Sequence, residues 1–387
     1  MRILVAGGGT GGHIYPALAV IEELEKSGYK DIIYVGSNAG MEIKIIPQLD
    51  LKFHFIHAGK FRRYHSNVII NLINPQTILS NIGDVFKVIR GFFQSRAIIR
   101  EYQPEIVFIK GGYVGLPVGL AAASMGYPLF IHESDSEMGL SNRILSRFAE
   151  RIMVSYPENF YTDLPKAKLI FTGNPVRKDL LKGSKDEGEK IFELKGSDPV
   201  IFIVGGSQGS HFINSLVAES VNDLLKKYQV IHVCGDNDFS WLMYLKSGLT
   251  VEAQKRYHLY SFLTGELKDA YAVSDLVISR AGQNFISEFC ALGKPMLLIP
   301  LGSSANSHQY RNAQIMMRQG AAYSLEEREL NKDLLMSQLE LIFEKEGEIE
   351  FLSKKSKEFG RTDAAKEMAG VIVDYLEMVA KEKEKKK

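Results

Sequence analysis

The sequence predicts an α/β fold in which two Rossmann-like, doubly wound parallel-sheet domains face a cleft. Two glycine-rich loops are the main evidence: residues 7–13 read GGGTGGH, and residues 205–210 read GGSQGS. Each loop follows a short apolar run, residues 2–6 and 200–204, that is typical of a buried parallel strand, and each opens a helical pattern. Because such glycines let a helix N-terminus present backbone N–H groups to an anion, the pair predicts a nucleotide-type domain in each half of the chain.

Length and composition agree with two soluble domains. The chain has 387 residues, whereas single hydrophobic cores stop growing at about 250–300 residues. A net charge of +1 argues against a nucleic-acid partner, because whole-protein nucleic-acid binders are strongly basic. The two cysteines, Cys234 and Cys290, lack the spacing of metal ligands, so we expect core thiols in a reducing compartment.

Strand patterns alternate with helical patterns along the chain, which favours parallel sheets. In the first half, strands are predicted at residues 31–35, 52–56, 106–109, 129–132, 152–155 and 169–172. In the second half, strands are predicted near residues 200, 230, 258 and 276 and at 295–299, with helices from about residue 330 onward. Pro16 is predicted to start the first helix. The segment GNPVR at residues 173–177, which leads into a polar run, predicts the domain junction.

No membrane-spanning segment is predicted. The uncharged stretch 111–131 has a sufficient length, but its glycines, Pro117 and Pro128 divide it into loop, helix and strand. The chain begins with a strand rather than with the pattern of a signal peptide, so we expect a cytoplasmic protein.

The first loop also fits the dinucleotide fingerprint GxGxxG at Gly7, Gly9 and Gly12. A nicotinamide enzyme would need an acidic residue at the end of the second strand, where the sequence has Gly-Ser-Asn at 36–38. Glu288, in a helix that follows a strand of the second half, is the alternative carboxylate for ribose hydroxyls. This position predicts a nucleotide on the C-terminal domain.

Motifs in register along the chain carry a family resemblance. They are GGTGGHxxPxLAV at 8–20, GGYVxxP at 111–117, HExxxxxGLxNR at 132–143, GNPVR at 173–177, GGSQG at 205–209, SRAG with SE at 279–288 and HQxxNA at 308–313. Together they resemble the MurG-type glycosyltransferases of peptidoglycan synthesis, from about residue 2 to 320 and more weakly beyond. The resemblance implies a GT-B, inverting, metal-independent enzyme without a cofactor that transfers N-acetylglucosamine (GlcNAc) from UDP-GlcNAc to lipid I, giving lipid II and UDP.

The resemblance also implies a domain arrangement. Residues 1–173 would bind the acceptor and dock on the membrane, with a C-terminal helix at about 362–380 that packs back on them. Residues 174–361 would bind UDP-GlcNAc, and residues 381–387 would be a charged tail.

The donor residues implied by the resemblance come from both halves. Ser207 and Arg177 would meet the diphosphate, the backbone of Leu263 the uracil, Glu288 the ribose and Gln309 the sugar. The complete donor set is Thr10, Gly11, Gly12, Asp135, Arg177, Ser207, Leu263, Gln283, Asn284, Phe285, Ile286, Ser287, Glu288 and Gln309.

The acceptor residues implied by the resemblance are Gly9, Gly12, Gly111, Gly112, Tyr113 and Asn142. The acceptor's 4-hydroxyl needs a base, and His13 at the mouth of the first glycine loop suits that role at cytoplasmic pH. Asp135 is a second candidate base, since the family's usual HEQN reads His-Glu-Ser-Asp here. Two further departures, Phe285 for a threonine and Asn306 for an aspartate, affect sugar contacts more than the reaction. His132 is expected to be structural.

Residues 52–100 combine basic charge with aromatic side chains. Eight lysines and arginines stand against one acid, Asp84, and apolar residues repeat at helical spacing. This composition suits docking on an anionic membrane at its cytoplasmic face, as a peripheral protein. The alternative is an amphipathic helix facing the core, which we expect for most of its apolar positions: Ile78, Ile82, Val85, Phe86, Ile89 and Phe93. Phe92 or Ile70, with the basic pair Arg62 and Arg63, would then reach the lipid.

Two other functions stay open at this point. A transferase that glycosylates diacylglycerol would share the fold and the membrane surface. A non-catalytic protein that binds a nucleotide sugar would share the glycine loops.

Overall fold

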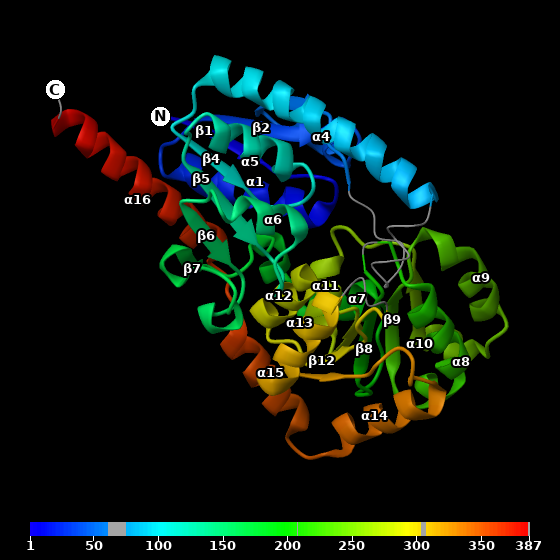
Figure 1. Cartoon of the computed structure of the whole chain (residues 1–387). Helices are drawn as coiled ribbons and strands as arrows, with labels where there is room; N and C mark the ends of the chain where they lie inside the picture. The colour runs from blue at the N-terminus through cyan, green and yellow to red at the C-terminus, as the bar shows by residue number, and fades with distance from the viewer. Residues whose placement is uncertain (61–74, 207, 303–306, 386–387) are drawn as a thin grey trace. The chain divides into compact units, whose positions relative to one another are not determined.

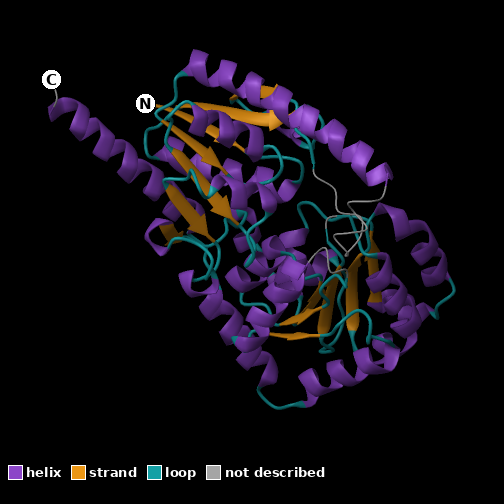
Figure 2. Ribbon diagram, viewed as in Figure 1, coloured by secondary structure: helices purple, strands orange, loops and turns teal. Residues whose placement is uncertain are grey.

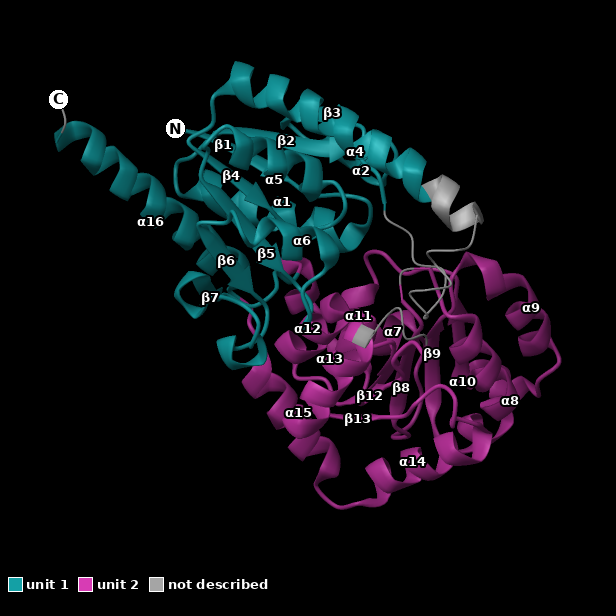
Figure 3. Ribbon diagram, in the orientation of Figure 1, with its two compact units in different colours: residues 1–176, 363–387 teal, residues 177–362 magenta. Residues whose placement is uncertain are grey.

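The computed structural model describes residues 1–60, 75–206, 208–302 and 307–385 (Figure 1). The chain divides into two compact units, shown in different colours in Figure 3. Unit 1 comprises Met1–Val176 and Asp363–Lys387, and unit 2 comprises Arg177–Thr362.

Unit 1 contains a seven-stranded parallel sheet in the order β3-β2-β1-β4-β5-β6-β7. Its strands are β1 (Arg2–Ala6), β2 (Asp31–Ser37), β3 (Lys52–Ile56), β4 (Ile106–Ile109), β5 (Leu129–Glu133), β6 (Arg151–Val154) and β7 (Leu169–Phe171). Its helices are α1 (Gly11–Lys26), α2 (Glu42–Ile45), α4 (Pro75–Tyr102), α5 (Gly115–Ser124), α6 (Leu140–Leu145) and α16 (Ala364–Lys385). Strand order reverses between β1 and β4, and ligands of such sheets bind beyond the carboxyl ends at this reversal.

One face of this sheet is covered by α1 together with α16, which arrives from the other end of the chain. Ile14 and Val20 of α1 share a core cluster with Met368, Ile372 and Leu376 of α16, and all five are fully buried. On the other side α4 contacts α5, and α5 contacts α6. Strands covered on both sides must be apolar throughout, which explains the continuous apolar runs in the sequence.

Unit 2 repeats this architecture with a six-stranded parallel sheet in the order β10-β9-β8-β11-β12-β13. Its strands are β8 (Val200–Val204), β9 (Gln229–Val233), β10 (Tyr257–Tyr260), β11 (Leu276–Ser279), β12 (Met296–Leu298) and β13 (Ala322–Ser324). Its helices are α7 (Lys185–Ile191), α8 (His211–Lys227), α9 (Asp236–Ser247), α10 (Val251–Arg256), α11 (Leu267–Val273), α12 (Gln283–Leu292), α13 (Ser307–Arg318), α14 (Lys332–Glu344) and α15 (Glu348–Phe359). Figure 2 shows helices on both sides of the strands in each unit, so the predicted doubly wound fold is confirmed.

Most predicted strands are present within one or two residues, and two details were wrong. β13 was not predicted, because its three residues, Ala-Tyr-Ser, are too short for a periodic signal. Helix α1 begins at Gly11 rather than at Pro16, which lies buried inside it. Stretch 111–131 divides into loop, α5 and β5 as predicted. Cys234 and Cys290 are free and buried, as expected of core thiols.

The expectation that the apolar positions of α4 face the core was wrong. The exposed fraction reaches 67% for Phe86 and 64% for Phe93, and the other described members of that face, Ile82, Val85 and Ile89, are also exposed. Ile78, Ile70, Arg62 and Arg63 lie outside the residues whose side chains are described.

Small and polar residues form the inner face of α4 instead. Asp84, Gly91 and Ser95 are buried, together with one large apolar residue, Ile99. A Cβ atom at Gly91 would lie 2.0 Å from the carbonyl oxygen of His57, so the helix approaches the loop after β3 too closely for large side chains. Across the described ranges, no helix is both long and apolar enough to cross a membrane.

Candidate active site

Glycine loops stand at the strand reversal of both sheets. In unit 1, the loop after β1 and the first residues of α1 carry Gly7–Gly12, and the loop after β4 carries Gly111 and Gly112. In unit 2, GGSQGS follows β8 and Arg-Ala-Gly follows β11. The two pairs of loops therefore occupy the positions at which open α/β sheets bind ligands.

Backbone approach explains why these positions are glycines. Gly112 has φ +81°, and a Cβ atom there would lie 2.8 Å from the carbonyl oxygen of Gly8. Gly209 has φ +79°, and its Cβ atom would lie 2.0 Å from the carbonyl oxygen of Cys234. Other residues would strain the backbone and separate the two segments that meet at each of these glycines.

A buried carboxylate that the sequence reasoning missed holds the first glycine loop. Glu42 is fully buried. It accepts hydrogen bonds from Gly9 N (3.0 and 3.2 Å), Ser37 N (2.8 Å) and Ser37 Oγ (2.6 Å). The amide of Gly9 is thus engaged inside the protein, and Tyr113 is joined to this cluster through its hydroxyl, 3.2 Å from Ser37 Oγ. The sequence offered a weak signal, an acidic residue shortly after the Gly-Ser-Asn that ends β2.

His13, the candidate base, lies at the start of α1 against the second glycine turn. A Cβ atom at Gly112 would lie 3.0 Å from His13 Cδ2, so the imidazole packs on that backbone. Burial, followed by the positive charge of Lys110, lowers the pKa of His13 to about 4. The imidazole is therefore neutral at pH 7, with its lone pair available, and it is a weaker base than an exposed histidine.

The loop after β5 is organised by Glu133. Its carboxylate accepts hydrogen bonds from Asp135 N, Gly139 N and Asn142 Nδ2, each at 3.0 Å. Asn142, predicted to contact the acceptor, is buried and also donates to the carbonyl oxygen of His132 at 2.8 Å. His132 is fully buried, with Nε2 2.9 Å from the carbonyl oxygen of Gly173, in keeping with the structural role expected of it.

Most of the predicted donor residues of unit 2 lie on α12 or contact it. Arg177 Nε donates to Glu288 Oε1 at 3.3 Å, and the hydroxyl of Tyr271 donates to Glu288 Oε2 at 3.1 Å. Burial raises the pKa of Glu288, while Arg177 and Tyr271 oppose that shift. Gln283 Nε2 donates to Ser287 Oγ at 3.1 Å along the same helix.

Other predicted donor residues differ in accessibility. The side chain of Ile286 is fully buried in the core, so only its backbone is available to a ligand. Phe285 packs on Phe289, with ring centroids 5.9 Å apart. Gln309 Oε1 accepts from Leu301 N at 3.1 Å, and Leu263 is buried. Asn284, Gly11 and Gly12 are partly exposed and Thr10 is exposed, whereas Ser207 and Asn306 lie outside the described residues.

Arg280 links the loops of unit 2 and was not singled out from the sequence. Its guanidinium donates to Ser210 Oγ at 2.8 Å and to Glu327 Oε1 at 2.9 Å. It also donates to the carbonyl oxygen of Ile299 at 3.2 Å. Buried Arg280 thereby ties the glycine loop after β8 to the segments that follow β12 and β13.

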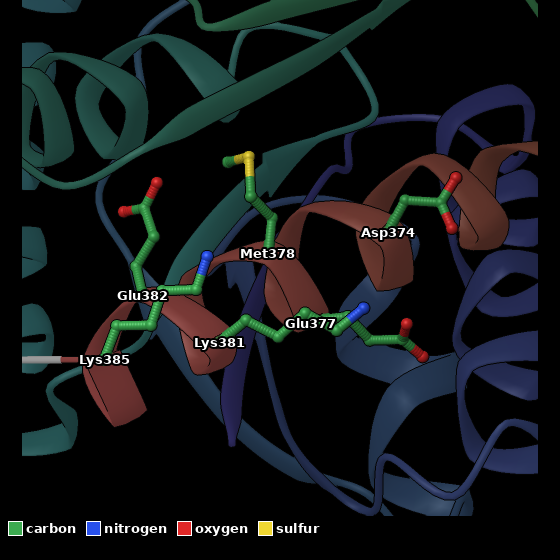
Figure 4. Close-up of a pocket in the computed structure, with 6 residues that line it drawn as sticks. All are labelled: Asp374, Glu377, Met378, Lys381, Glu382 and Lys385. Atoms are coloured by element: carbon green, nitrogen blue, oxygen red, sulfur yellow. The ribbon is translucent and has the colours of Figure 1, made fainter.

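Elsewhere in unit 1, a surface pocket of about 430 Å³ follows α16 (Figure 4). Its lining residues are Asp374, Glu377, Met378, Lys381, Glu382 and Lys385. All of them come from one helix, away from the glycine loops. Within the parts of the chain that the structure describes, no group of three or more His, Cys, Asp or Glu side chains is arranged to hold a metal ion.

The fold and these loops define the class of protein. The chain aligns with a crystal structure of Acinetobacter baumannii MurG at a TM-score of 0.74, with 23% identity over 96% of this chain and 99% of that one. It aligns with a kitacinnamycin glycosyltransferase at a TM-score of 0.71, with 16% identity over 96% of this chain and 98% of that one. The protein has the fold of a GT-B glycosyltransferase.

Sequence comparison gives the family. The N-terminal domain model of glycosyltransferase family 28 matches residues 3–154, and its C-terminal domain model matches residues 200–368. The chain belongs to this family.

Two relatives carry the name UDP-N-acetylglucosamine–N-acetylmuramyl-(pentapeptide) pyrophosphoryl-undecaprenol N-acetylglucosamine transferase. The one from Clostridium botulinum is 39% identical over 89% of this chain and 91% of its own length. The one from Lachnospira eligens is 37% identical over 88% of this chain and 91% of its own length.

Proposed function

We propose that this protein transfers GlcNAc from UDP-GlcNAc to the 4-hydroxyl of the N-acetylmuramoyl (MurNAc) residue in lipid I, giving lipid II and UDP. The observation that carries the proposal is the likeness to relatives named for this reaction along about nine tenths of the chain. The glycine loops at both strand reversals supply the anion-binding backbone that two diphosphate-containing substrates require.

The donor is assigned to unit 2. Backbone N–H groups at the start of α8, with Ser207 and the guanidinium of Arg177, would hold the diphosphate and stabilise the negative charge that develops as UDP leaves. Glu288 would accept hydrogen bonds from the ribose hydroxyls. The backbone of Leu263 would contact the uracil, residues 283–287 at the start of α12 the nucleoside, and Gln309 the sugar.

The acceptor and the base are assigned to unit 1. The 4-hydroxyl oxygen of MurNAc attacks C1 of GlcNAc, the bond from C1 to the UDP oxygen breaks, and the configuration at C1 inverts. Neutral His13 takes the hydroxyl proton, and the bond electrons leave with the diphosphate. Thr10, Gly11, Gly12 and Asp135 would face the transferred sugar from this unit.

Acceptor contacts are assigned to Gly12, Gly111, Gly112 and Tyr113. Gly9 and Asn142 contribute indirectly, because the amide of Gly9 is bound to Glu42 and the side-chain amide of Asn142 to Glu133. They shape the loops that the acceptor would meet.

The exposed face of α4 supports docking at the cytoplasmic face of the membrane. Phe86 and Phe93 lie in the same helix as Lys87, Arg90 and Arg100, all exposed. Aromatic side chains that enter the lipid boundary beside basic residues are the usual composition of a peripheral anionic-membrane surface. Such a surface suits an acceptor that carries a lipid tail.

Product formation from defined substrates tests the proposal. Purified protein with UDP-GlcNAc and a lipid I analogue should release UDP and form the disaccharide lipid, while UDP-glucose or UDP-galactose should react poorly. Diacylglycerol as acceptor tests the alternative glycolipid transferase. Transfer to diacylglycerol but not to the lipid I analogue would replace the proposed acceptor, and binding of UDP-GlcNAc without transfer to either would favour a non-catalytic protein.

A further inference from the structure

Lys110 is a fully buried lysine at the carboxyl end of β4, directly before the glycine turn 111–112. Its ammonium donates to Ser134 Oγ at 2.9 Å and to Asn174 Oδ1 at 3.3 Å. Ser134 Oγ in turn lies 3.4 Å from Asn174 Oδ1. One side chain thus joins the strand reversal of unit 1 to the loop after β5 and to the segment that follows β7.

Charged and titratable groups face Lys110 from two sides. Glu133 and Asp135, in the segment at the end of β5, oppose the effect of burial, which lowers the pKa of the Lys110 ammonium to about 7. Burial lowers the pKa of two nearby imidazoles, those of His13 in α1 and His132 in β5. The positive charge of Lys110 lowers both pKa values further. Lys110 is therefore the basic group of a largely buried cluster that also contains the carboxyl groups of Glu133 and Asp135 and two neutral imidazoles.

Burying an ammonium group costs free energy of folding, so packing alone does not explain a lysine at position 110. Ser134 and Asp135 are also the two positions at which the sequence motif has serine and aspartate in place of two amides. A carboxylate at 135 adds negative charge beside the buried Glu133, whose pKa is raised to about 7 by burial and then by Asp135. An ammonium within the same cluster offsets that charge.

We propose that Lys110 is a positioning residue for glycosyl transfer: it holds the loop of residues 134–139 through Ser134 and Asn174, and it is the counter-charge of Glu133 and Asp135. The inference rests on the proposed function, in which Asp135 faces the transferred sugar and His13 accepts the proton. Lys110 touches neither substrate in this scheme. It acts through the loop and through the charge that its neighbours experience.

A double-mutant cycle tests the coupling. Lys110→Met keeps the length of the side chain and removes the charge, and it should lower kcat by about tenfold or more, the scale of a misplaced reacting group, with KM for UDP-GlcNAc changed less than about twofold. Asp135→Asn removes the carboxylate beside Glu133 and is the second single variant of the cycle. The double variant should be more active than Lys110→Met alone, because the uncompensated negative charge is smaller.

Lys294→Met is the matched control. Lys294 is another lysine of low exposure, in unit 2, where it donates to the carbonyl oxygens of Ala272 and Ser274 at 3.2 and 2.8 Å. Burial lowers its pKa to about 8. Any effect on stability that comes from the loss of a buried ammonium should therefore appear in both variants. Only Lys110→Met should change kcat. Equal effects of the two variants would make Lys110 an ordinary structural lysine.

The pH profile gives a second measurement. Without the ammonium, the pKa of His13 should rise, so the acid limb of kcat/KM for the acceptor should move to higher pH in Lys110→Met but not in Lys294→Met. An unmoved limb together with independent, multiplicative effects of Lys110→Met and Asp135→Asn would overturn the proposal.

Unfolding in urea separates this inference from the proposed function. If the wild-type protein forms no product from UDP-GlcNAc and lipid I analogue, the function is wrong, yet the four proteins of the cycle still report the coupling. The urea midpoint of the double variant should then lie above that of Lys110→Met, and additive midpoint shifts would refute the charge pairing. Lys110→Gln, which keeps a donor for Ser134, replaces Lys110→Met if that variant does not fold.

Discussion

Arg177 Nε lies 3.3 Å from Glu288 Oε1, and the pair is formed within one unit. The second carboxylate oxygen of Glu288 accepts a hydrogen bond from the hydroxyl of Tyr271. Each oxygen of the carboxylate therefore has a hydrogen-bond partner within the protein. The side chain of Arg177 is 36% exposed, whereas that of Glu288 is 12% exposed. Arg177 is therefore the partner with room to turn toward a diphosphate, which would leave a Glu288 lone pair for ribose hydroxyls.

Glu288→Gln should weaken donor binding without unfolding the protein. Hydrogen bonds to a charged partner contribute roughly 1.5 to 3 kcal/mol, and the amide also loses the ion pair with Arg177. Calorimetry with UDP measures the change. Tyr271→Phe is the control, because it removes one hydrogen bond from the carboxylate and keeps the charge; its effect should be smaller. Unchanged UDP affinity in Glu288→Gln would separate this carboxylate from the ribose.

His13→Ala should lower kcat by about 100-fold or more, the usual scale for a lost general base. Asp135→Asn, which restores the amide usual at this position, should be mild. Steady-state kinetics with saturating UDP-GlcNAc and a lipid I analogue compares the two. The reverse order, with Asp135→Asn nearly inactive and His13→Ala active, would assign the base to the carboxylate and leave His13 to organise the glycine turn.

Acid should destabilise the fold below about pH 6.5. Burial lowers the pKa of His13 to about 4 and that of His232 to about 3, against an unfolded value of 6.5. The unfolded chain then binds protons at higher pH than the native one, so the stability that these neutral imidazoles allow is complete above pH 6.5 and is lost as pH falls toward 4 and 3. Each histidine contributes a slope of about 1.4 kcal/mol per pH unit within that window.

Urea unfolding of the wild type and of His232→Asn between pH 7 and pH 5 measures this slope. His232 is fully buried in unit 2, between Asn214 and Tyr257, away from the proposed base. The variant should be less stable at pH 7 but should lose less stability on acidification. Parallel curves for the two proteins would mean that His232 does not contribute to acid unfolding.

The sequence allowed the α/β class and nearly all strands to be predicted, because a fully covered parallel strand is apolar at every position, as in Val-Ile-Phe-Ile-Val of β8. Glycine loops were equally visible, since close backbone approach at Gly112 and Gly209 excludes other residues. These are local properties, and a sequence expresses them directly.

Features that depend on contacts between distant segments were not predictable in the same way. Glu42 and Lys110 read as ordinary charged residues, and Arg280 was visible only as one letter of the SRAG motif. Only the fold places these three among glycine-loop amides, buried carboxylates and loop ends. The predicted orientation of α4 was wrong for a similar reason. Apolar periodicity identifies an amphipathic helix, but it does not identify which face of the helix is buried. The stripe of small residues at Gly91 and Ser95 decides it, because it fits against the backbone at His57.

Chelation should leave turnover intact. In the proposed mechanism, helix N-termini and Arg177 stabilise the leaving diphosphate, and no step uses a metal ion. Initial rates with excess EDTA should equal those without it. Loss of activity on chelation, restored by magnesium or manganese, would contradict the metal-independent mechanism.

Membrane docking should depend on the exposed face of α4 and on the basic pair Arg62 and Arg63. Phe86→Ser with Phe93→Ser should weaken binding to phosphatidylglycerol vesicles by at least about tenfold, since fully burying one such side chain contributes about 1.5–3 kcal/mol. Arg62→Glu with Arg63→Glu should weaken it most at low salt, because screening shortens the reach of the lipid charge. Vesicle sedimentation at two salt concentrations distinguishes the apolar part from the electrostatic one.

Tyr244→Ser is the matched control for this surface, because Tyr244 is an aromatic residue of α9 in unit 2 with an exposed fraction of 83%. It should bind vesicles as the wild type does. All variants should keep their turnover on a water-soluble acceptor, since none of these side chains belongs to the proposed donor or acceptor residues. If the phenylalanine variant and the Tyr244 control bind equally well, the apolar face of α4 contacts something other than lipid, and basic residues alone must account for any attraction to the membrane.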